Sequence, residues 1–267
     1  MRAPFSRLRL RSVGPIVVGL IAICAAAPAA AQGGYYLEAA GDQSSVEIGT
    51  SEQTWRNARL SAGFFEDGRA GWSAGVERLQ RDQLVDWGAS ARGFRRNGDW
   101  TVSGGIGFGA DPSFSYRQSY EGELARTVVG TLVAHGGYRY LGFDTAKVHL
   151  IQPGATLYMP HGDIGARFFI VRNATRATTT GTLLVQGTVT VNRRVRLGGG
   201  GAFGERIFDI AALSTPNASA WVGFAYAHFT ASPQWGIDVG VGRAHEDPLF
   251  SQGTFSVGVR RTFGGRP

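Results

Sequence analysis

Alternation of apolar and polar residues constrains this chain more than any other feature of its sequence. Between residues 100 and 109, Trp100, Val102, Ile106 and Phe108 share one set of alternate positions, and threonine, serine or glycine holds the other set. Successive side chains of a β-strand point to opposite faces, so a period of two predicts a strand with one apolar face. No stretch has a convincing helical period. We therefore expect an all-β fold.

Segments of this kind recur about every 10 to 20 residues between residues 34 and 263, which gives up to fourteen candidate strands. Some of them could join into one long strand or fill the interior of a barrel. We therefore expect about 12 strands and keep 14 as the alternative, because membrane barrels of a single chain have an even number.

The polarity of the two faces separates a barrel from a soluble β-sandwich. A sandwich buries branched aliphatic side chains between its sheets, whereas a membrane barrel turns an apolar, aromatic face to lipid and keeps glycine and charge inside. Glycine is frequent here, at 40 of 267 residues, and it shares the polar face with charged residues. This favours a closed antiparallel transmembrane β-barrel. A periplasmic sandwich that acts as a binding module is the competing class.

The first residues have the order of a secretory signal peptide: four arginines, an apolar stretch, and three alanines before Gln32. We expect cleavage after Ala31, so that residues 1–31 are a signal peptide and residues 32–267 form one barrel domain. Secretion of a barrel predicts the cell outer membrane as its location.

Composition excludes several function classes. Cys24 is the one cysteine and lies in the expected signal, so the mature chain offers no disulfide, thiolate metal site or cysteine nucleophile. Four of the 27 basic residues also lie there, and the remaining chain has an excess of about +3 over its 20 acidic residues. That excess does not indicate a nucleic-acid partner. No cofactor is predicted.

Two hairpins suggest which side chains face the lumen. If one turn is centred on Gly142, His135 lies opposite His149, with Arg139 and Lys147 on the same face. The two histidines could hold a metal or act as acid and base, but the neighbouring cations disfavour both roles. A polar pair in the lumen is the preferred interpretation.

The second hairpin turns at residues 81–82 and pairs Val76 with Trp87 on the apolar face. The same register sets Glu77 opposite Asp86 on the polar face, where Arg92 or Arg167 could neutralise them. We expect a network of lumen charges that tunes or blocks a pore. A pair of catalytic carboxylates is the alternative.

Two glycine motifs resemble the signatures of enzymes. Residues 71–75 spell G-x-S-x-G and residues 199–204 spell G-x-G-x-x-G. The first needs a strand-to-helix turn and the second a βαβ unit, and neither context is expected here. No catalytic or metal-ligating residue is therefore predicted.

Four short motifs follow one another along the chain: ERLQRD at 77–82 leading into Asp86 and Trp87, GFGADPSF at 107–114, GYRYL at 137–141 and QPGATLY at 152–158. In order and spacing they resemble the YaiO-type outer-membrane β-barrel family, from about Trp55 onward. The resemblance implies an outer-membrane barrel, a fold often described without a defined activity. It implies no catalytic residues.

The expected partners follow from that location. Outer-membrane lipids would contact the apolar face, and the barrel-assembly machinery would read the C-terminal strand, which ends at Phe263. A glycan or small solute is a further candidate. We expect an envelope protein without defined catalytic activity, either a narrow pore or a structural scaffold. The alternative is a barrel enzyme that acts on lipid or surface glycan.

Overall fold

The computed structural model describes residues 33–66, 68–205, 219–246 and 250–264. The expected signal peptide, residues 1–31, lies outside them. The described residues form a barrel of fourteen strands, and they contain no helix that could cross a membrane. The strands are β1 (Gly34–Ile48), β2 (Ser51–Glu66), β3 (Ala70–Arg81), β4 (Leu84–Asn97), β5 (Trp100–Ala110), β6 (Gln118–Val129), β7 (Leu132–Gly142), β8 (Lys147–Met159), β9 (Gly162–Asn173), β10 (Thr178–Asn192), β11 (Val195–Glu205), β12 (Ser219–Ser232), β13 (Trp235–Glu246) and β14 (Phe250–Phe263).

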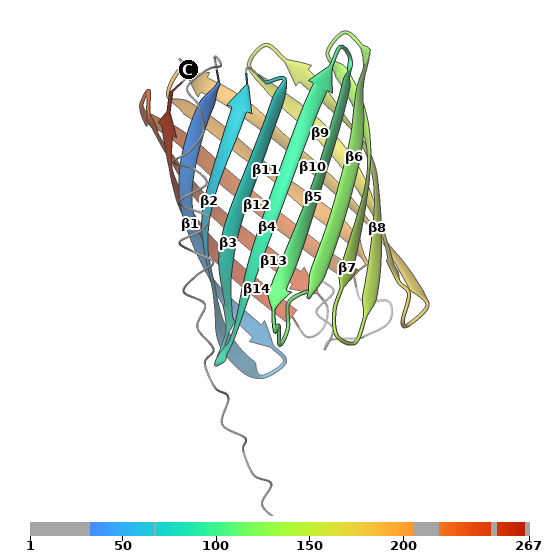
Figure 1. The fold of residues 1–267 in the computed structure, drawn as a ribbon. Helices are drawn as coiled ribbons and strands as arrows, with labels where there is room; N and C mark the ends of the chain where they lie inside the picture. Colours follow the sequence, from blue (N-terminus) through green and yellow to red (C-terminus); the bar gives the residue numbers. More distant parts are fainter. Residues whose placement is uncertain (1–32, 67, 206–218, 247–249, 265–267) are drawn as a thin grey trace, which may run out of the picture. The chain divides into compact units, whose positions relative to one another are not determined.

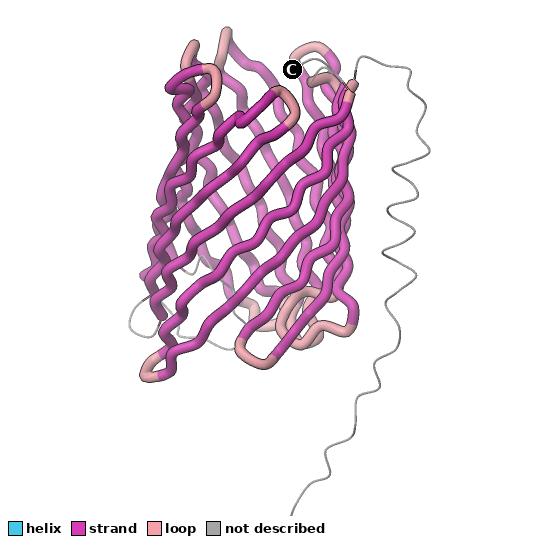
Figure 2. Tube along the Cα trace, turned by 90° about the vertical axis from the view of Figure 1, so that its left-hand side faces the viewer, coloured by secondary structure: helices cyan, strands magenta, loops and turns pink. Residues whose placement is uncertain are grey.

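Each strand pairs antiparallel with its neighbours in sequence, and β1 pairs with β14 to close the barrel (Figure 1). Tyr35 lies opposite Phe263 at this seam. Closure leaves no strand edge with unpaired backbone groups, which is the condition for a sheet to cross a membrane. The preferred number of 12 strands is wrong and the alternative of 14 is correct. Segments that could have merged are separate tilted strands (Figure 2).

The two ends of the barrel differ in the length of their connections. At the end that holds Gly34 and Phe263, the turns contain two or three residues, and Gly98 and Gly130 adopt positive φ of +57° and +54° in two of them. At the other end, loop 111–117 has seven residues and the connection 206–218 has thirteen. Outer-membrane barrels have short periplasmic turns and longer extracellular loops. By this criterion the end that holds Gly34 and Phe263 is the periplasmic end.

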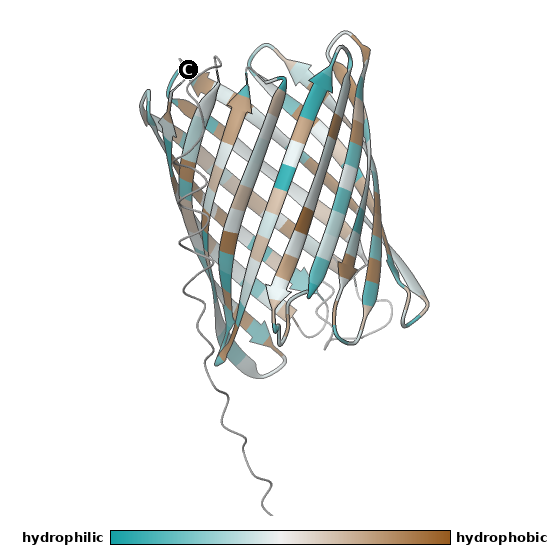
Figure 3. Ribbon diagram, viewed as in Figure 1, coloured by the Kyte–Doolittle hydropathy of each residue, from teal (hydrophilic) through white to brown (hydrophobic). Residues whose placement is uncertain are grey.

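Successive side chains of a strand point to opposite faces, and hydrophilic and hydrophobic residues follow one another along the strands (Figure 3). Val102, Ile106 and Phe108 point outward and are 56%, 48% and 48% exposed. Their neighbours Gly105 and Gly107 lie on the inner face with Glu121 and Ser119 of β6. This arrangement confirms the predicted polarity of the barrel.

The β7–β8 hairpin differs from its prediction. The strands continue to Gly142 and resume at Lys147, so the turn is centred between residues 144 and 145. His135 lies opposite Gly154, and His149 lies opposite Tyr140. The shift is an odd number of residues, which moves β8 side chains to the other face. The pairing of His135 with His149 is therefore wrong.

The β3–β4 hairpin is displaced by two residues. Glu77 lies opposite Gly88, and Asp86 lies opposite Leu79. The predicted pairing of Glu77 with Asp86 is wrong, but an even shift preserves the faces. Both carboxylates still point into the lumen.

Apolar side chains narrow part of the lumen at the extracellular end. Val46, Ala244 and Phe250 are buried there, and Ile48, Trp55 and Val222 pack against them. Trp55 thus points inward, whereas Trp72 and Trp100 are exposed on the outer face. The cluster joins β1 and β2 to β12–β14 and leaves the wall from β3 to β9 to form the polar part of the lumen.

Candidate functional site

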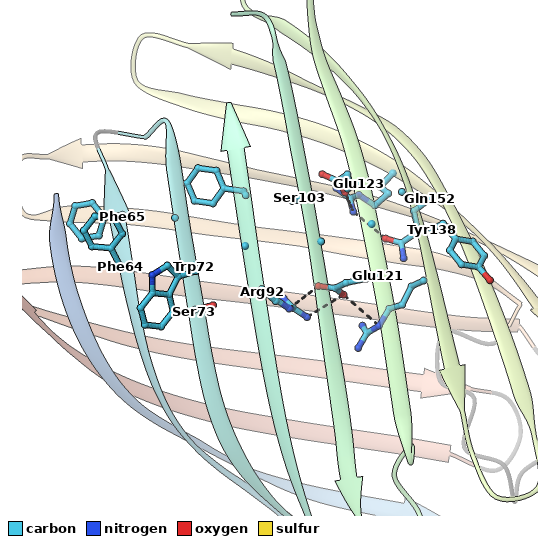
Figure 4. A pocket seen from close by; sticks show the side chains of 18 of the residues that line it. Phe64, Phe65, Trp72, Ser73, Arg92, Ser103, Glu121, Glu123, Tyr138 and Gln152 are labelled. Atoms are coloured by element: carbon cyan, nitrogen blue, oxygen red, sulfur yellow. Dashed lines mark hydrogen bonds and ion pairs between the residues drawn. The ribbon is translucent and has the colours of Figure 1, made fainter. Parts of the chain in front are cut away.

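Three cavities follow one another along the polar wall of the lumen. The first, about 710 Å³, begins at the periplasmic turn of Gly130. It shares Glu123 and Arg167 with a cavity of about 510 Å³ (Figure 4). That cavity shares Arg92 and Glu121 with a third of about 380 Å³, which also reaches Tyr116. The cavities therefore lie in series between the periplasmic rim and loop 111–117, and charged side chains line each of them.

Ion pairs between strands that lie one to three positions apart in the sheet line these cavities. Glu121 of β6 lies between Arg92 of β4, at 2.8 Å, and Arg139 of β7, at 3.7 Å. Figure 4 shows Glu121 reaching across the cavity wall toward Arg92. Two residues further along β6, Glu123 pairs with Arg167 of β9 at 2.8 Å. Arg167 also donates a hydrogen bond to Gln152. These partly exposed pairs give the cavities fixed charges of both signs.

A second ion-pair group closes the seam of the barrel. Glu38 of β1 accepts hydrogen bonds of 2.9 Å from Arg59 of β2 and from Nε of Arg260 of β14. The carboxylate side chain is 11% exposed, so it is held between two cations with little access to water. Sequence reasoning missed this group, because its members lie in the first, second and last strands and meet only when the barrel closes.

Asp86 has a different role from the one expected. Its side chain is 1% exposed and accepts hydrogen bonds from the backbone N–H groups of Ser113, Phe114 and Ser115, at 2.7, 2.9 and 2.7 Å. A carboxylate can be buried when several donors replace its water shell. Asp86 therefore fastens loop 111–117 to the wall of the barrel. We call this arrangement the latch.

Aromatic and cationic groups complete the latch. The guanidinium of Arg81 lies 4.4 Å from the ring centre of Trp55 and 4.5 Å from that of Phe114. The hydroxyl of Tyr116 lies 3.4 Å from a carboxylate oxygen of Glu77, at the end of the third cavity. Arg81 thus bridges the loop to the apolar cluster at the extracellular end, and Tyr116 bridges it to the lumen charges.

The remaining predicted residues divide between the two faces. His135 points into the first cavity, 3.4 Å from the hydroxyl of Thr156, and no hydrogen-bond partner for its buried Nδ1 lies among the described residues. His149 and Lys147 lie on the outer face of β8, so the prediction that they face the lumen is wrong. Arg92, Arg139 and Glu77 line the cavities as described above. Whether these residues bind a solute stays a prediction.

The groups with catalytic potential are few. His228 of β12 forms a 2.9 Å contact with Asp238 of β13, an inward pair that the sequence analysis did not single out. Ser73 of the G-x-S-x-G motif lies within β3, and the G-x-G-x-x-G motif lies within β11. In the part of the chain that is described, no three His, Cys, Asp or Glu side chains gather as a metal site.

Part of this chain matches a known family of membrane barrels. The model of the YaiO membrane beta barrel domain matches residues 94–204. The YaiO resemblance is confirmed. The match contains three of the four motifs that suggested it, and the fourth, at 77–87, lies before it. In the folded barrel, the YaiO motifs supply Glu77, Asp86, Phe114, Arg139 and Gln152 to the lumen and latch.

Solved structures agree with the YaiO assignment at the level of the fold. The chain resembles the TodX deltaS2S3 mutant monoaromatic hydrocarbon channel, with a TM-score of 0.58, 8% identity and 94% of each chain covered. It also resembles an anion-selective porin from Comamonas acidovorans, with a TM-score of 0.50, 10% identity and coverage of 86% of this chain and 99% of the porin. No curated protein matches the sequence. The protein is an outer-membrane β-barrel.

Proposed function

We propose that this barrel is a narrow pore for small polar solutes, constricted at its extracellular end by the latch. The observation that supports this function best is the series of three cavities that share charged residues along one wall of the lumen. Paired charges keep such a wall wet and its glycines leave space beside them, whereas a filled scaffold would pack that space.

The competing scaffold function needs no continuous aqueous route. The enzymatic alternative, action on lipid or surface glycan, rested on the His135/His149 and Glu77/Asp86 pairs. The histidines lie on opposite faces, and the carboxylate of Asp86 already accepts three backbone hydrogen bonds from loop 111–117. We therefore retain the pore as the one proposed function. Residues 1–31 are proposed as its cleaved secretion signal, so the intact mass of protein from the outer membrane should correspond to a chain that begins at Gln32.

Single-channel recording with a matched pair of substitutions tests the pore. Ser103 lines the second cavity, and the next residue in β5, Val102, faces lipid. In planar bilayers we expect the native protein to give small conductance steps, Ser103→Trp to reduce them, and Val102→Trp to leave them unchanged. Absence of steps from folded native protein would favour the scaffold. Equal conductance in both variants would contradict passage of ions through the lumen.

A further inference from the structure

The outer face of β8 and β9 carries a group of cations near the extracellular rim. Lys147 is the first residue of β8, and His149 lies opposite Arg172 of β9. Lys147 and Arg172 are exposed, and they project from the barrel on the face that also carries Ile151 and Tyr138, 53% and 47% exposed. The cations therefore stand where the apolar outer surface ends.

Three tyrosines mark the boundary below these cations. Tyr120 and Tyr140 stack with ring centres 6.1 Å apart, and Tyr140 packs against His149 at 5.3 Å. The hydroxyl of Tyr138 forms a 2.7 Å hydrogen bond with Nδ1 of His149. Tyrosine is enriched where the hydrocarbon of a bilayer meets its headgroups. The arrangement places Lys147 and Arg172 at headgroup depth.

These two cations differ from those of the lumen. Arg92, Arg139 and Arg167 each have a carboxylate partner, whereas no ion pair found among the described residues involves Lys147 or Arg172. Asp144, in the adjoining turn, pairs with Arg117. Two exposed cations at headgroup depth attract an anion, and a phosphate group suits both an ammonium and a guanidinium.

Two outward arginines of the opposite rim have aromatic partners. Arg126 lies over the ring of Trp100 at 5.0 Å, and Arg261 lies over Trp235 at 5.3 Å. Each of these cations is thus associated with an aromatic face. Lys147 and Arg172 stand at the extracellular rim, where the outer leaflet of a Gram-negative outer membrane presents the phosphates of its glycolipid.

We infer that Lys147, Arg172 and the Tyr138–Tyr140–His149 group form a binding site for a phosphorylated glycolipid of the outer leaflet. The cations bind the phosphate, and the tyrosines contact the sugar and the upper part of the acyl chains. Sugar rings present both polar edges and apolar faces, as tyrosine side chains do. The site is independent of whether the lumen conducts.

Native mass spectrometry of the detergent-solubilised full barrel tests this inference with three lipids. They are a bis-phosphorylated diglucosamine lipid, its dephosphorylated form and phosphatidylglycerol. The variant is Lys147→Gln with Arg172→Gln, and the control is Arg95→Gln, which removes an exposed outward cation at the periplasmic rim. Heat-modifiable gel mobility establishes that each variant is folded.

We expect the native protein to bind the phosphorylated glycolipid in preference to the other two lipids. Since each cation near an anionic headgroup strengthens binding about fivefold, the double variant should bind about 25-fold more weakly, and the control should be unchanged. The inference is overturned if the folded double variant binds as tightly as native protein. It is equally overturned if the dephosphorylated lipid binds as tightly as the phosphorylated glycolipid, or if phosphatidylglycerol binds as tightly as that glycolipid.

Discussion

The carboxylate of Asp86 accepts a 2.7 Å hydrogen bond from the backbone N–H of Ser113, twenty-seven residues further along the chain. Two more N–H groups of the same loop donate to this carboxylate. A strand residue therefore holds an extracellular loop inside the barrel. Backbone N–H groups that enter a lumen need hydrogen-bond acceptors, and the one carboxylate of Asp86 accepts from three of them.

Replacement of Asp86 by alanine should release the latch. Each hydrogen bond to a charged group contributes about 1.5–3 kcal/mol, so loss of even one should speed hydrogen exchange of the loop about tenfold or more. The released loop should also leave the third cavity and raise single-channel conductance. Exchange mass spectrometry of peptides covering residues 111–117, together with bilayer recordings, measures both effects.

Asp99→Ala is the control for this change, because it removes the same charge from a periplasmic turn between β4 and β5. Loop exchange should match that of native protein. Slow exchange of the loop in Asp86→Ala would show that other contacts hold the latch, and the proposed role of the carboxylate would then be rejected.

Tyr116 should make the latch sensitive to alkaline pH. Burial and the nearby negative charge of Glu77 raise the pKa of this phenol above its ordinary value of 10.0. The neutral form is favoured in the folded loop, so its contribution is complete below pH 10 and is lost as the pH rises through the raised pKa. Ultraviolet titration at 295 nm should reveal one late-ionising tyrosine that is missing in Tyr116→Phe. Loop exchange in native protein should accelerate over the same pH interval, and an identical titration of both proteins would refute the assignment.

The latch also shows where sequence reasoning ends. Alternation predicted the outward face of β5 correctly, because lipid and water impose opposite polarity on Val102 and Ser103. Nothing in the segment 107–114 signals that its backbone turns inward, since its partner Asp86 lies in β4, twenty-seven residues before Ser113.

The position of His149 was mispredicted for a related reason. Near the extracellular rim the inner wall contains Leu141 and Val148, and the outer wall contains Lys147 and His149. Polarity is reversed there because the outer surface has left the hydrocarbon and meets polar headgroups. The rule that charged side chains face the lumen holds only at hydrocarbon depth. The register is set by a turn of four residues, and alternation alone does not predict the length of that turn.

Glycine in the G-x-G-x-x-G segment has a steric role that a substitution can test. A Cβ atom at Gly200 would lie 2.5 Å from the backbone oxygen of Val185, whereas one at Gly136 would meet nothing within 4 Å. Backbone cannot yield as a flexible side chain can, so Gly200→Ala should destabilise the barrel by about 1–3 kcal/mol. Gly136→Ala should cause no loss. Urea unfolding in micelles, followed by tryptophan fluorescence, measures both variants, and equal midpoints would contradict close packing at Gly200.

Phe263 should matter for assembly more than for stability. It ends β14 on the outer face, opposite Tyr35 at the seam, and Arg261 lies 4.8 Å from its ring centre. If the assembly machinery reads this terminal strand, Phe263→Ala should lower the amount of folded barrel in outer-membrane fractions. Phe255→Ala is the matched control, because it removes the same side chain from the same face of β14, where Phe255 is 54% exposed. Both purified variants should refold equally in detergent, since each loses one lipid-facing ring. Equal losses of the two variants in cells would assign the effect to stability and remove Phe263 as a recognition residue.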